Sequence, residues 1–400
     1  MFDPASVRVQ GPLRAHMEGF WAELLRVGYA PLSAGNLLRV AADLGRWLEA
    51  EGLDLVDLGE DVVTGFLRHR RRRGYTHFLT RRALDPLLSY LRGIGAIPVP
   101  TPVLDHSPAG QLMREYAAYL RQERGLVAQT IRAYTDFATR FVSDERPRLD
   151  LGRLTATQVS SFVLRRARQS SSIATSKLMV THLRSLLRFL HVRGAIDRDL
   201  SAAVPAVAGW RLAGLPKGLE ASQIATLLSS FDGSPVGLRD SAIVRLLLRL
   251  GLRAGEVAAV QLEDVDWRAG ELSVHGKGRH QSRLPLPADV GRVLARYVRH
   301  GRPRAGTRSL FLRCRAPYVG IRSSGVIGVA QRALRRAGVL SGGAHLLRHT
   351  AATQLLRLGA SLPEIAHVLR HRHIDTTAIY AKVDLASLGA LAQPWPGGAP

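Results

Sequence analysis

The stretch AHLLRHTAAT (Ala344–Thr353) carries two histidines and an arginine at helical spacing. His345, Arg348 and His349 stand at positions i, i+3 and i+4, so a helix would place the three side chains on one face. Three potential cations on one face are unfavourable unless an anion lies opposite. The H-x-x-x-H spacing also occurs in zinc-binding helices, but that motif needs a glutamate where this chain has Leu346. The pattern therefore predicts an anion site without a metal.

A second stretch, VLRHRHIDTTAIYAKV (Val368–Val383), surrounds one tyrosine with positive charge. Ser361 to Glu364 fits a capping box, which predicts a helix from about residue 362 to residue 369. His371 then lies in a turn, and a second helix carries Tyr380. A lone tyrosine at helical spacing is more often a core residue than a nucleophile. Tyr380 therefore gains a catalytic interpretation only through the other motifs.

Two more motifs precede these stretches in the chain. GLRAGEVAAV (Gly251–Val260) places Arg253 between an apolar helix and the start of another, and VHGKGRHQSRLPLP (Val274–Pro287) reads as a hairpin with Lys277 at its tip. Each motif alone is more typical of a surface cation than of a catalytic one. The short candidate strands 265–267, 271–275 and 283–286 predict a small antiparallel sheet within a mixed α/β domain.

The first half of the chain contains an internal repeat. LLSYLRGIGAI (Leu87–Ile97) aligns with LLRFLHVRGAI (Leu186–Ile196), and Asp54–Leu67 aligns with Asp150–Val163. Both copies have apolar residues at helical spacing, which predicts two helical bundles. We therefore expect a mainly α, multidomain chain in four segments: a degenerate first copy over residues 1–100, a second helical domain over 108–204, the mixed α/β domain over 219–388, and a Pro/Gly-rich tail over 389–400.

The charge balance favours a polyanionic partner. The chain has 56 Lys and Arg against 32 Asp and Glu, a formal net charge of +24, and nucleic acid is the first candidate for such a protein. The run from His69 to Arg73 is either a solvated helix end or a phosphate-contacting patch. One cysteine excludes an internal disulfide framework and fits a reducing compartment. The sequence has no apolar run of about 20 residues and no apolar signal core, so we expect a cytoplasmic protein that does not enter membranes.

Taken in chain order, six residues resemble the tyrosine recombinase (phage integrase) family. The family pattern is an arginine after a G-L-R turn, a hairpin lysine, H-x-x-R, a histidine or tryptophan, and a tyrosine about nine residues later. This chain supplies Arg253, Lys277, His345, Arg348, His371 and Tyr380. The resemblance covers about residues 219–385, and more weakly the helical repeat, whose second copy resembles the family's SAM-like, core-binding DNA-binding domain.

One position departs from the family pattern. The family usually has Leu-Gly-His before the tyrosine helix, whereas this chain has Arg370 between Leu369 and His371. Glycine at a helix C-terminus supplies a left-handed cap, which arginine adopts at a cost of about 1 kcal/mol. We expect Arg370 either to shift His371 or to add a phosphate contact.

The resemblance implies a site-specific recombinase or integrase that acts in integration, excision or transposition through a covalent 3′-phosphotyrosine. Tyr380 would be the nucleophile, and Arg253 and Arg348 would hold the phosphate. His345 would assist proton transfer, His371 would hydrogen-bond the phosphate, and Lys277 would protonate the departing 5′-hydroxyl. The positive charge should also favour the phenolate of the nucleophile.

This chemistry needs neither cofactor nor metal ion, and we interpret the acidic run Glu263–Asp266 as a solvated turn and not as a two-metal site. The implied partners are duplex DNA and three further copies of the chain, which form a tetramer on DNA; no small-molecule substrate is expected. The first bundle could bind outlying DNA or a neighbouring subunit. Further candidates for DNA contact are Arg279, Arg283, Arg70, Arg71, Arg72 and Arg370. The alternatives are a DNA-binding protein of this fold with altered catalysis and a DNA-relaxing enzyme of the type IB topoisomerase kind.

Overall fold

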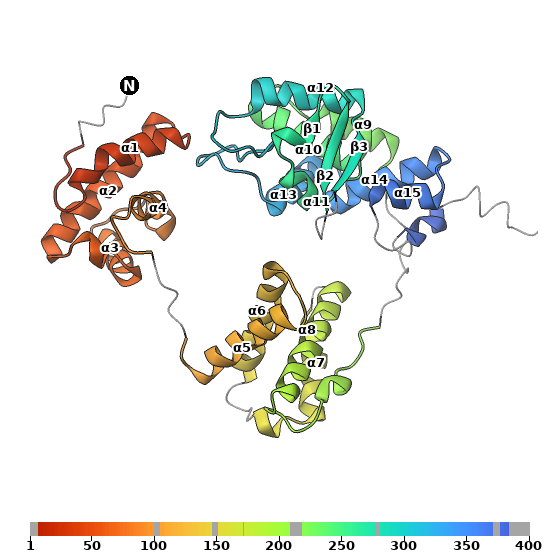
Figure 1. Ribbon diagram of the computed structural model, residues 1–400, viewed down its shortest axis with the longest axis horizontal. Coiled ribbons are helices and arrows are strands. Elements are labelled where there is room, and N and C mark those ends of the chain that lie inside the picture. The colour runs from red at the N-terminus through yellow and green to blue at the C-terminus, as the bar shows by residue number, and fades with distance from the viewer. Residues whose placement is uncertain are drawn as a thin grey trace, which may run out of the picture. The chain divides into compact units, whose positions relative to one another are not determined.

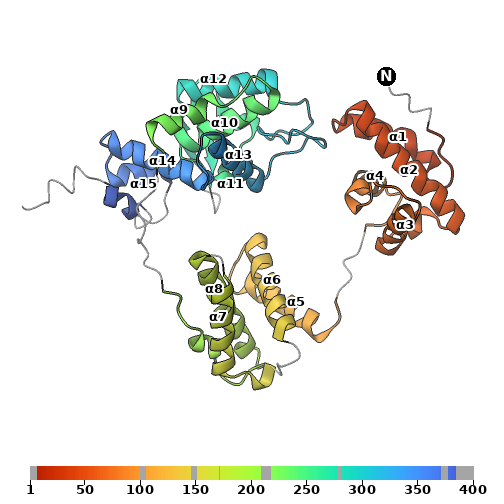
Figure 2. The same ribbon diagram turned by 180° about the vertical axis from the view of Figure 1, so that it is seen from behind.

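The computed structural model describes residues 7–99, 105–145, 151–170, 172–208, 218–276, 281–370 and 377–383. Residues 101–213 form one compact unit, and residues 1–100 and 214–400 are grouped in a second. Along the chain, two helical bundles precede a mixed α/β module (Figures 1 and 2). Among the described residues, no helix has both the length and the apolar character that crossing a membrane would require.

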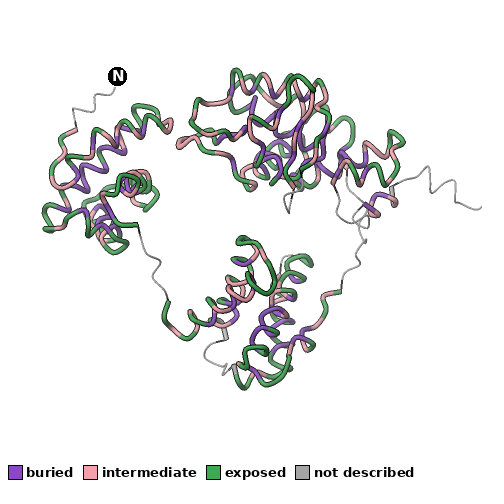
Figure 3. Tube along the Cα trace, in the orientation of Figure 1, coloured by how far each residue is buried: buried purple, intermediate pink, exposed green. Residues whose placement is uncertain are grey.

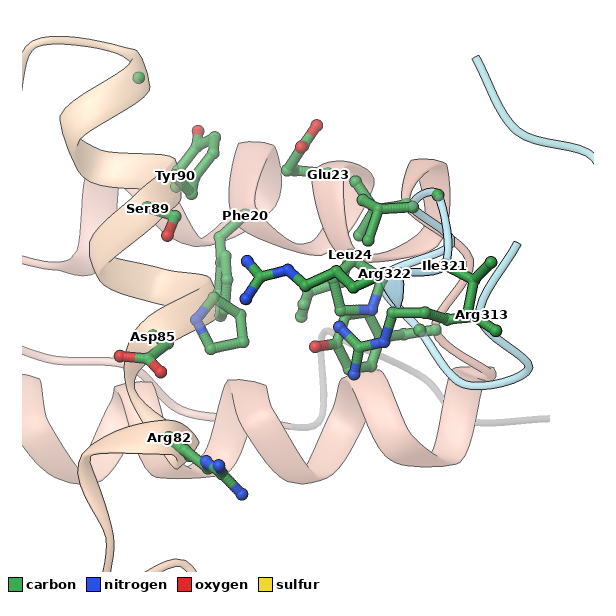
Figure 4. A pocket seen from close by; sticks show the side chains of 18 of the residues that line it. Phe20, Glu23, Leu24, Arg82, Asp85, Ser89, Tyr90, Arg313, Ile321 and Arg322 are labelled. Atoms are coloured by element: carbon green, nitrogen blue, oxygen red, sulfur yellow. The ribbon is translucent and has the colours of Figure 1, made fainter. Parts of the chain in front are cut away.

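The first bundle contains four α-helices. They are α1 (Met17–Arg26), α2 (Pro31–Glu51), α3 (Glu60–Arg72) and α4 (Asp85–Gly93), with 3-10 turns at Arg14–His16, Leu55–Asp57 and Arg81–Ala83. Phe20, Leu44, Phe66 and Leu88 fill its core, and the buried parts of the trace face the inside of the bundle in Figure 3. Phe20 and Leu24 of α1, with Asp85 and Tyr90 of α4, lie along the pocket drawn in Figure 4.

The second bundle also contains four α-helices, of which the first, third and fourth are longer than their counterparts in the first bundle. They are α5 (Pro108–Gln122), α6 (Ala128–Glu145), α7 (Ala156–Gln169) and α8 (Ile173–Val192), with 3-10 turns at Leu151–Arg153 and Leu200–Ala203. Each copy has a 3-10 turn just before its third helix, and each fourth helix is followed by a left-handed glycine, Gly95 or Gly194. The two bundles therefore share these features in the order of their elements. The buried Tyr116 donates a 3.0 Å hydrogen bond to Ser185 inside this core.

The α/β module is built around a central helix and a small sheet. Its helices are α9 (Ala221–Ser229), α10 (Pro235–Arg249), α11 (Ala254–Ala259), α12 (Ala288–Arg296), α13 (Ser323–Arg336), α14 (Ala344–Arg357) and α15 (Leu362–Leu369). Its strands are β1 (Val265–Asp266), β2 (Glu271–His275) and β3 (Gln281–Pro285). Shorter turns cover Leu262–Asp264, Tyr297–Gly301 and η10 (Ala378–Val383). Helix α10 is buried along most of its length and packs against α12, α13 and α14.

The sheet is antiparallel in the order β1-β2-β3. Val265 pairs with Leu272, and Leu272 pairs with Leu284. These three side chains are buried in the module's core, as the alternation of apolar and polar residues requires. The predicted fold, mainly helical with a small antiparallel sheet, is confirmed. The hairpin tip that carries Lys277 lies outside the described residues.

Candidate active site

Helix α14 carries the three side chains that the helical spacing grouped, and it gives each a different environment. Arg348 is 6% exposed, His349 is partly buried, and His345 is exposed. The helix that the spacing predicted is present, but the three side chains do not form a uniform cationic face. Arg348 is the buried centre, and the two histidines flank it at different depths.

Arg348 is fixed by backbone carbonyls at the ends of two other helices. Its guanidinium donates to the Gly251 carbonyl after α10 and to the Leu369 carbonyl at the end of α15. Burial, followed by the charge of Arg253, lowers the pKa of Arg348 to about 10, so the side chain is still a cation at neutral pH. The two carbonyls therefore fix the position of this buried cation.

The close approach of the ends of α10 and α15 requires a glycine at position 251. Its φ is +56°, and a Cβ added there would meet Cδ2 of Leu369 at 2.5 Å. Glycine therefore allows the end of α10 to approach the end of α15 closely. The G-L-R motif thus combines a close backbone contact at Gly251 with the cation of Arg253 two residues later.

Arg253 lies at the N-terminus of α11 and is held by Glu256. Its Nη1 donates to Glu256 Oε1 at 2.7 Å, its backbone N–H donates to Glu256 Oε2 at 2.8 Å, and its Nη2 donates to the Arg370 carbonyl at 3.2 Å. The Arg253 side chain is 42% exposed, whereas that of Glu256 is 6% exposed. The site therefore pairs an accessible arginine with a buried one, Arg348.

Glu256 was missed by the sequence analysis. It also accepts from Arg370 Nη2 at 2.8 Å, so one buried carboxylate joins two guanidinium groups. Burial alone would raise the pKa of Glu256, but the hydrogen bond from Arg253 and the charge of Arg370 outweigh it and lower the pKa. The available signal was the spacing R-x-x-E, in which a glutamate at the third helical position reaches back to the helix start.

Arg370 has the predicted left-handed conformation, with φ of 56° and ψ of 48° at the end of α15. Its side chain is 12% exposed. Besides the contact with Glu256, Nη1 donates to the Val368 carbonyl at 2.8 Å, and Nε has no partner among the described residues. In this conformation Arg370 supports the carboxylate beside Arg253 and does not project toward solvent.

Tyr380 is the most deeply buried of the predicted site residues that the structure describes. It lies in η10, is 2% exposed, and packs with Ala352, Ile365 and Leu369. Its hydroxyl lies 2.7 Å from His349 Nδ1. Burial raises the pKa of Tyr380 to about 12, and the charge of Arg348 only partly opposes this effect. The expectation that the cluster favours the phenolate is therefore wrong for this conformation, because desolvation exceeds the effect of the nearby cation.

His349 is the second residue whose part was not foreseen. Burial, with the charges of His345 and Arg348, lowers its pKa. A neutral imidazole beside a neutral phenol fits a hydrogen bond from the hydroxyl to an unprotonated Nδ1. The helical spacing had grouped His349 with Arg348, but Tyr380 is 31 residues away in sequence, and only the packing of η10 on α14 brings the two together.

The remaining candidates are placed differently. Arg70 is 4% exposed and forms an ion pair with Asp43, so it is not the surface phosphate contact that was predicted. Arg71 and Arg72 are exposed at the end of α3. Arg283, on β3, has a side chain that is 75% exposed. Lys277, Arg279 and His371 lie outside the described residues.

The three carboxylates of the acidic run Glu263–Asp266 each interact with a different partner. Glu263 pairs with Arg308, Asp264 lies 2.8 Å from His275 Nε2, and Asp266 caps the turn that leads into β2. Within the described ranges, no group of three His, Cys, Asp or Glu side chains could hold a metal ion.

Comparisons with known proteins identify families and relatives that resemble this chain. The family model "Phage integrase family" matches residues 217–386, and "Phage integrase, N-terminal SAM-like domain" matches residues 113–194. The putative integrase/recombinase y4rA of Sinorhizobium fredii is 40% identical over 98% of this chain and 96% of its own length. Tyrosine recombinase XerD of Mycobacterium tuberculosis is 30% identical over 72% of this chain and 97% of its own length.

Two solved structures share the fold. XerH recombinase, in a post-cleavage complex with its palindromic difH substrate, has a TM-score of 0.58 at 17% identity and covers 84% of this chain and 95% of its own. A lambda integrase dimer bound to a core site has a TM-score of 0.53 at 19% identity and covers 68% of this chain and 94% of its own. At these identities the likeness concerns the fold alone.

Proposed function

Because the chain belongs to the tyrosine recombinase (phage integrase) family, we propose that it is a site-specific recombinase that cuts and rejoins duplex DNA through Tyr380. The observation that carries the proposal is the meeting of four elements at one place. Arg348 from α14 is anchored to the ends of α10 and α15, and the Tyr380 hydroxyl contacts His349 on the same helix as Arg348. A nucleophile beside a fixed guanidinium suits phosphoryl transfer.

The reaction would proceed by transesterification. The Tyr380 oxygen forms a bond to phosphorus, the bond from phosphorus to the 5′-oxygen breaks, and a covalent 3′-phosphotyrosine results. The phenol gives up its proton to a histidine, and the 5′-oxygen takes one from Lys277 in the role that the resemblance implies. A 5′-hydroxyl from another strand then reverses the steps. Nothing is oxidised or reduced, and the energy of the phosphodiester is retained.

The two arginines would stabilise the charge on the non-bridging phosphate oxygens. A planar guanidinium can donate to two oxygens at once, and the accessible Arg253 is the group that a phosphate meets first. In related phosphoryl transfers one arginine contributes about 10³–10⁵ in rate. We therefore assign the phosphate clamp to Arg253 and Arg348, with Glu256 holding Arg253 in position.

The nucleophile has to move before it can react. A hydroxyl on a side chain that is 2% exposed does not reach a DNA phosphate, so η10 must shift when DNA binds. His345 lies one turn before His349 on α14 and is exposed. It is thus the histidine within reach once Tyr380 turns outward, which agrees with the proton-transfer role that the resemblance gives it.

Both the α5–α8 bundle and the α/β module would contact the DNA. The structural neighbours were solved with DNA, one with its difH substrate and one with a core site, and the charge of +24 fits the same partner. We further propose that four protomers assemble on two duplexes and that the protein acts in the cytoplasm.

A suicide substrate tests the proposal. A duplex that the full chain selects from random sequence is nicked near the cleavage point, so that the cleaved fragment is lost and the covalent complex accumulates. The wild-type chain should form a protein–DNA adduct, and Tyr380→Phe should bind the duplex equally well without forming one. Binding without an adduct by the wild-type chain would favour the catalytically altered alternative. Relaxation of supercoiled plasmid without site preference would favour a topoisomerase.

A further inference from the structure

Arg370 adds a third guanidinium group to the two arginines that we assign to the phosphate clamp. Arg253, Arg348 and Arg370 lie around one buried carboxylate, that of Glu256. These four side chains together carry an excess of two positive charges. With the glycine that is usual at position 370 in the family, the excess would be one. The additional charge is therefore a property of this chain that its family membership does not explain.

The Glu256 carboxylate binds the two guanidinium groups through different oxygens. Oε1 accepts from Arg253 Nη1 at 2.7 Å, and Oε2 accepts from Arg370 Nη2 at 2.8 Å. Burial would raise the pKa of Glu256, but the hydrogen bond from Arg253 and the charge of Arg370 outweigh it and lower the pKa. The carboxylate is therefore ionised at neutral pH, and Arg370 shares with Arg253 the task of balancing its charge.

The Arg370 side chain is held against the carboxylate and away from the surface. It is 12% exposed, whereas the side chain of Arg253 is 42% exposed. The Arg370 carbonyl also accepts from Arg253 Nη2 at 3.2 Å. Arg370 thus reaches Arg253 in two ways, through its own backbone and through Glu256. These contacts fit an action on Arg253 better than a direct contact with a phosphate.

The backbone at position 370 is strained for an arginine. Its φ of 56° lies in the region that favours glycine, and among the described residues Phe78 is the one other non-glycine residue with a positive φ. Strained residues persist where the surrounding structure holds them, and they gather at functional sites. Here the Val368 carbonyl and the Glu256 carboxylate hold the guanidinium. The strain therefore lies directly beside Arg253.

We propose that Arg370 is a positioning residue for DNA cleavage and acts through Glu256 on Arg253. It balances part of the Glu256 charge, so the carboxylate still orients Arg253 while the charge of Arg253 remains available to the phosphate. The inference rests on the proposed function, in which Arg253 and Arg348 stabilise the charge on the non-bridging oxygens. That charge develops in the transition state, so Arg370 affects the cleavage rate more than the affinity for DNA.

Three substitutions at position 370 test the proposal in the full chain. The rate of adduct formation is measured with the suicide substrate at a DNA concentration that saturates the protein, and the affinity is measured separately. Arg370→Lys keeps a positive charge and should retain most of the rate. Arg370→Ala and Arg370→Gly remove the charge and should slow adduct formation by about 10–100-fold, the effect of one hydrogen bond between charged groups, with nearly unchanged affinity.

The alanine and glycine variants separate the rate from the stability. Glycine relieves the left-handed backbone and alanine does not, so Arg370→Gly should be the more stable of the two, yet both should be equally slow. A wild-type rate for Arg370→Gly would show that Arg370 is a structural residue only, and would overturn the proposal.

Arg357→Ala is the matched control for the loss of one charge, because Arg357 is exposed at the end of α14. It should leave the rate of adduct formation unchanged. If this control slowed adduct formation as much as Arg370→Ala, the effect would be one of general charge, and the proposal would fail.

Glu256→Gln tests the route of the effect. Glutamine leaves no negative charge for Arg370 to balance, so adding Arg370→Ala to Glu256→Gln should cost little further rate. An undiminished loss in that background would overturn the proposal in favour of a direct phosphate contact by Arg370 or a shift of His371. A wild-type chain that forms no adduct would overturn the proposed function and this inference together. A wild-type adduct that forms at the same rate with every residue at position 370 would overturn the inference alone.

Discussion

Arg370 combines a left-handed backbone conformation with a largely buried, charged side chain. Its φ of 56° carries a free-energy cost that glycine would avoid, while its guanidinium donates to the buried Glu256 at 2.8 Å. A hydrogen bond between charged groups contributes about 1.5–3 kcal/mol. The contact therefore exceeds the backbone cost, and this explains why an arginine can occupy a position that suits glycine.

Two substitutions at Arg370 separate these opposing effects. Arg370→Ala keeps the strained backbone and removes the ion pair, so it should reduce the free energy of unfolding by about 2 kcal/mol. Arg370→Gly removes the ion pair but relieves the strain, so its destabilisation should be about 1 kcal/mol smaller. Urea denaturation of both variants measures the difference. Equal stability of the two variants would show that the left-handed backbone carries no cost here.

The helices and strands nearest the site were predictable because their signals are local. The capping box at Ser361 and the spacing of His345 and Arg348 correctly predicted α15 and α14. The contacts between elements were not predictable. Arg370 and Glu256 are 114 residues apart, and no periodicity in either segment indicates their pairing. The burial of Arg70 depended in the same way on Asp43, which lies on another helix.

The junction of α10, α14 and α15 is the element-scale feature on which the site depends most. Gly251→Ala would place a Cβ 2.5 Å from Leu369 Cδ2 in a backbone with φ of +56°. We expect it to lower the free energy of unfolding by about 1–3 kcal/mol and to slow adduct formation, because both carbonyls that hold Arg348 lie at this junction. Thermal unfolding and the suicide substrate measure the two effects.

Gly255→Ala provides a matched control for that substitution. Gly255 lies in α11 near Arg253, and a Cβ added there meets nothing within 4 Å. Alanine in a helix should stabilise the chain by about 0.5–1 kcal/mol and leave adduct formation unchanged. If Gly255→Ala slowed cleavage as much as Gly251→Ala, the effect would not come from the contact with Leu369.

At the scale of the whole molecule, the excess of positive charge is not confined to the active site. Exposed arginines lie at the end of α3 and at Arg253, and the chain as a whole carries a formal charge of +24. A protein that neutralises several phosphates at once releases the counterions condensed on them, so its affinity depends steeply on salt. The three modules should contribute jointly to that dependence.

Salt titration of DNA binding by the full chain measures this contribution. If the chain contacts six to ten phosphates, its affinity should fall by about 10³–10⁵ between 50 and 200 mM salt. Tyr380→Phe should give the same slope, because the hydroxyl that it lacks is neutral and buried before cleavage. A slope near zero would mean that few phosphates are contacted, so the chain's positive charge would have to be attributed to something other than a duplex lying along these modules.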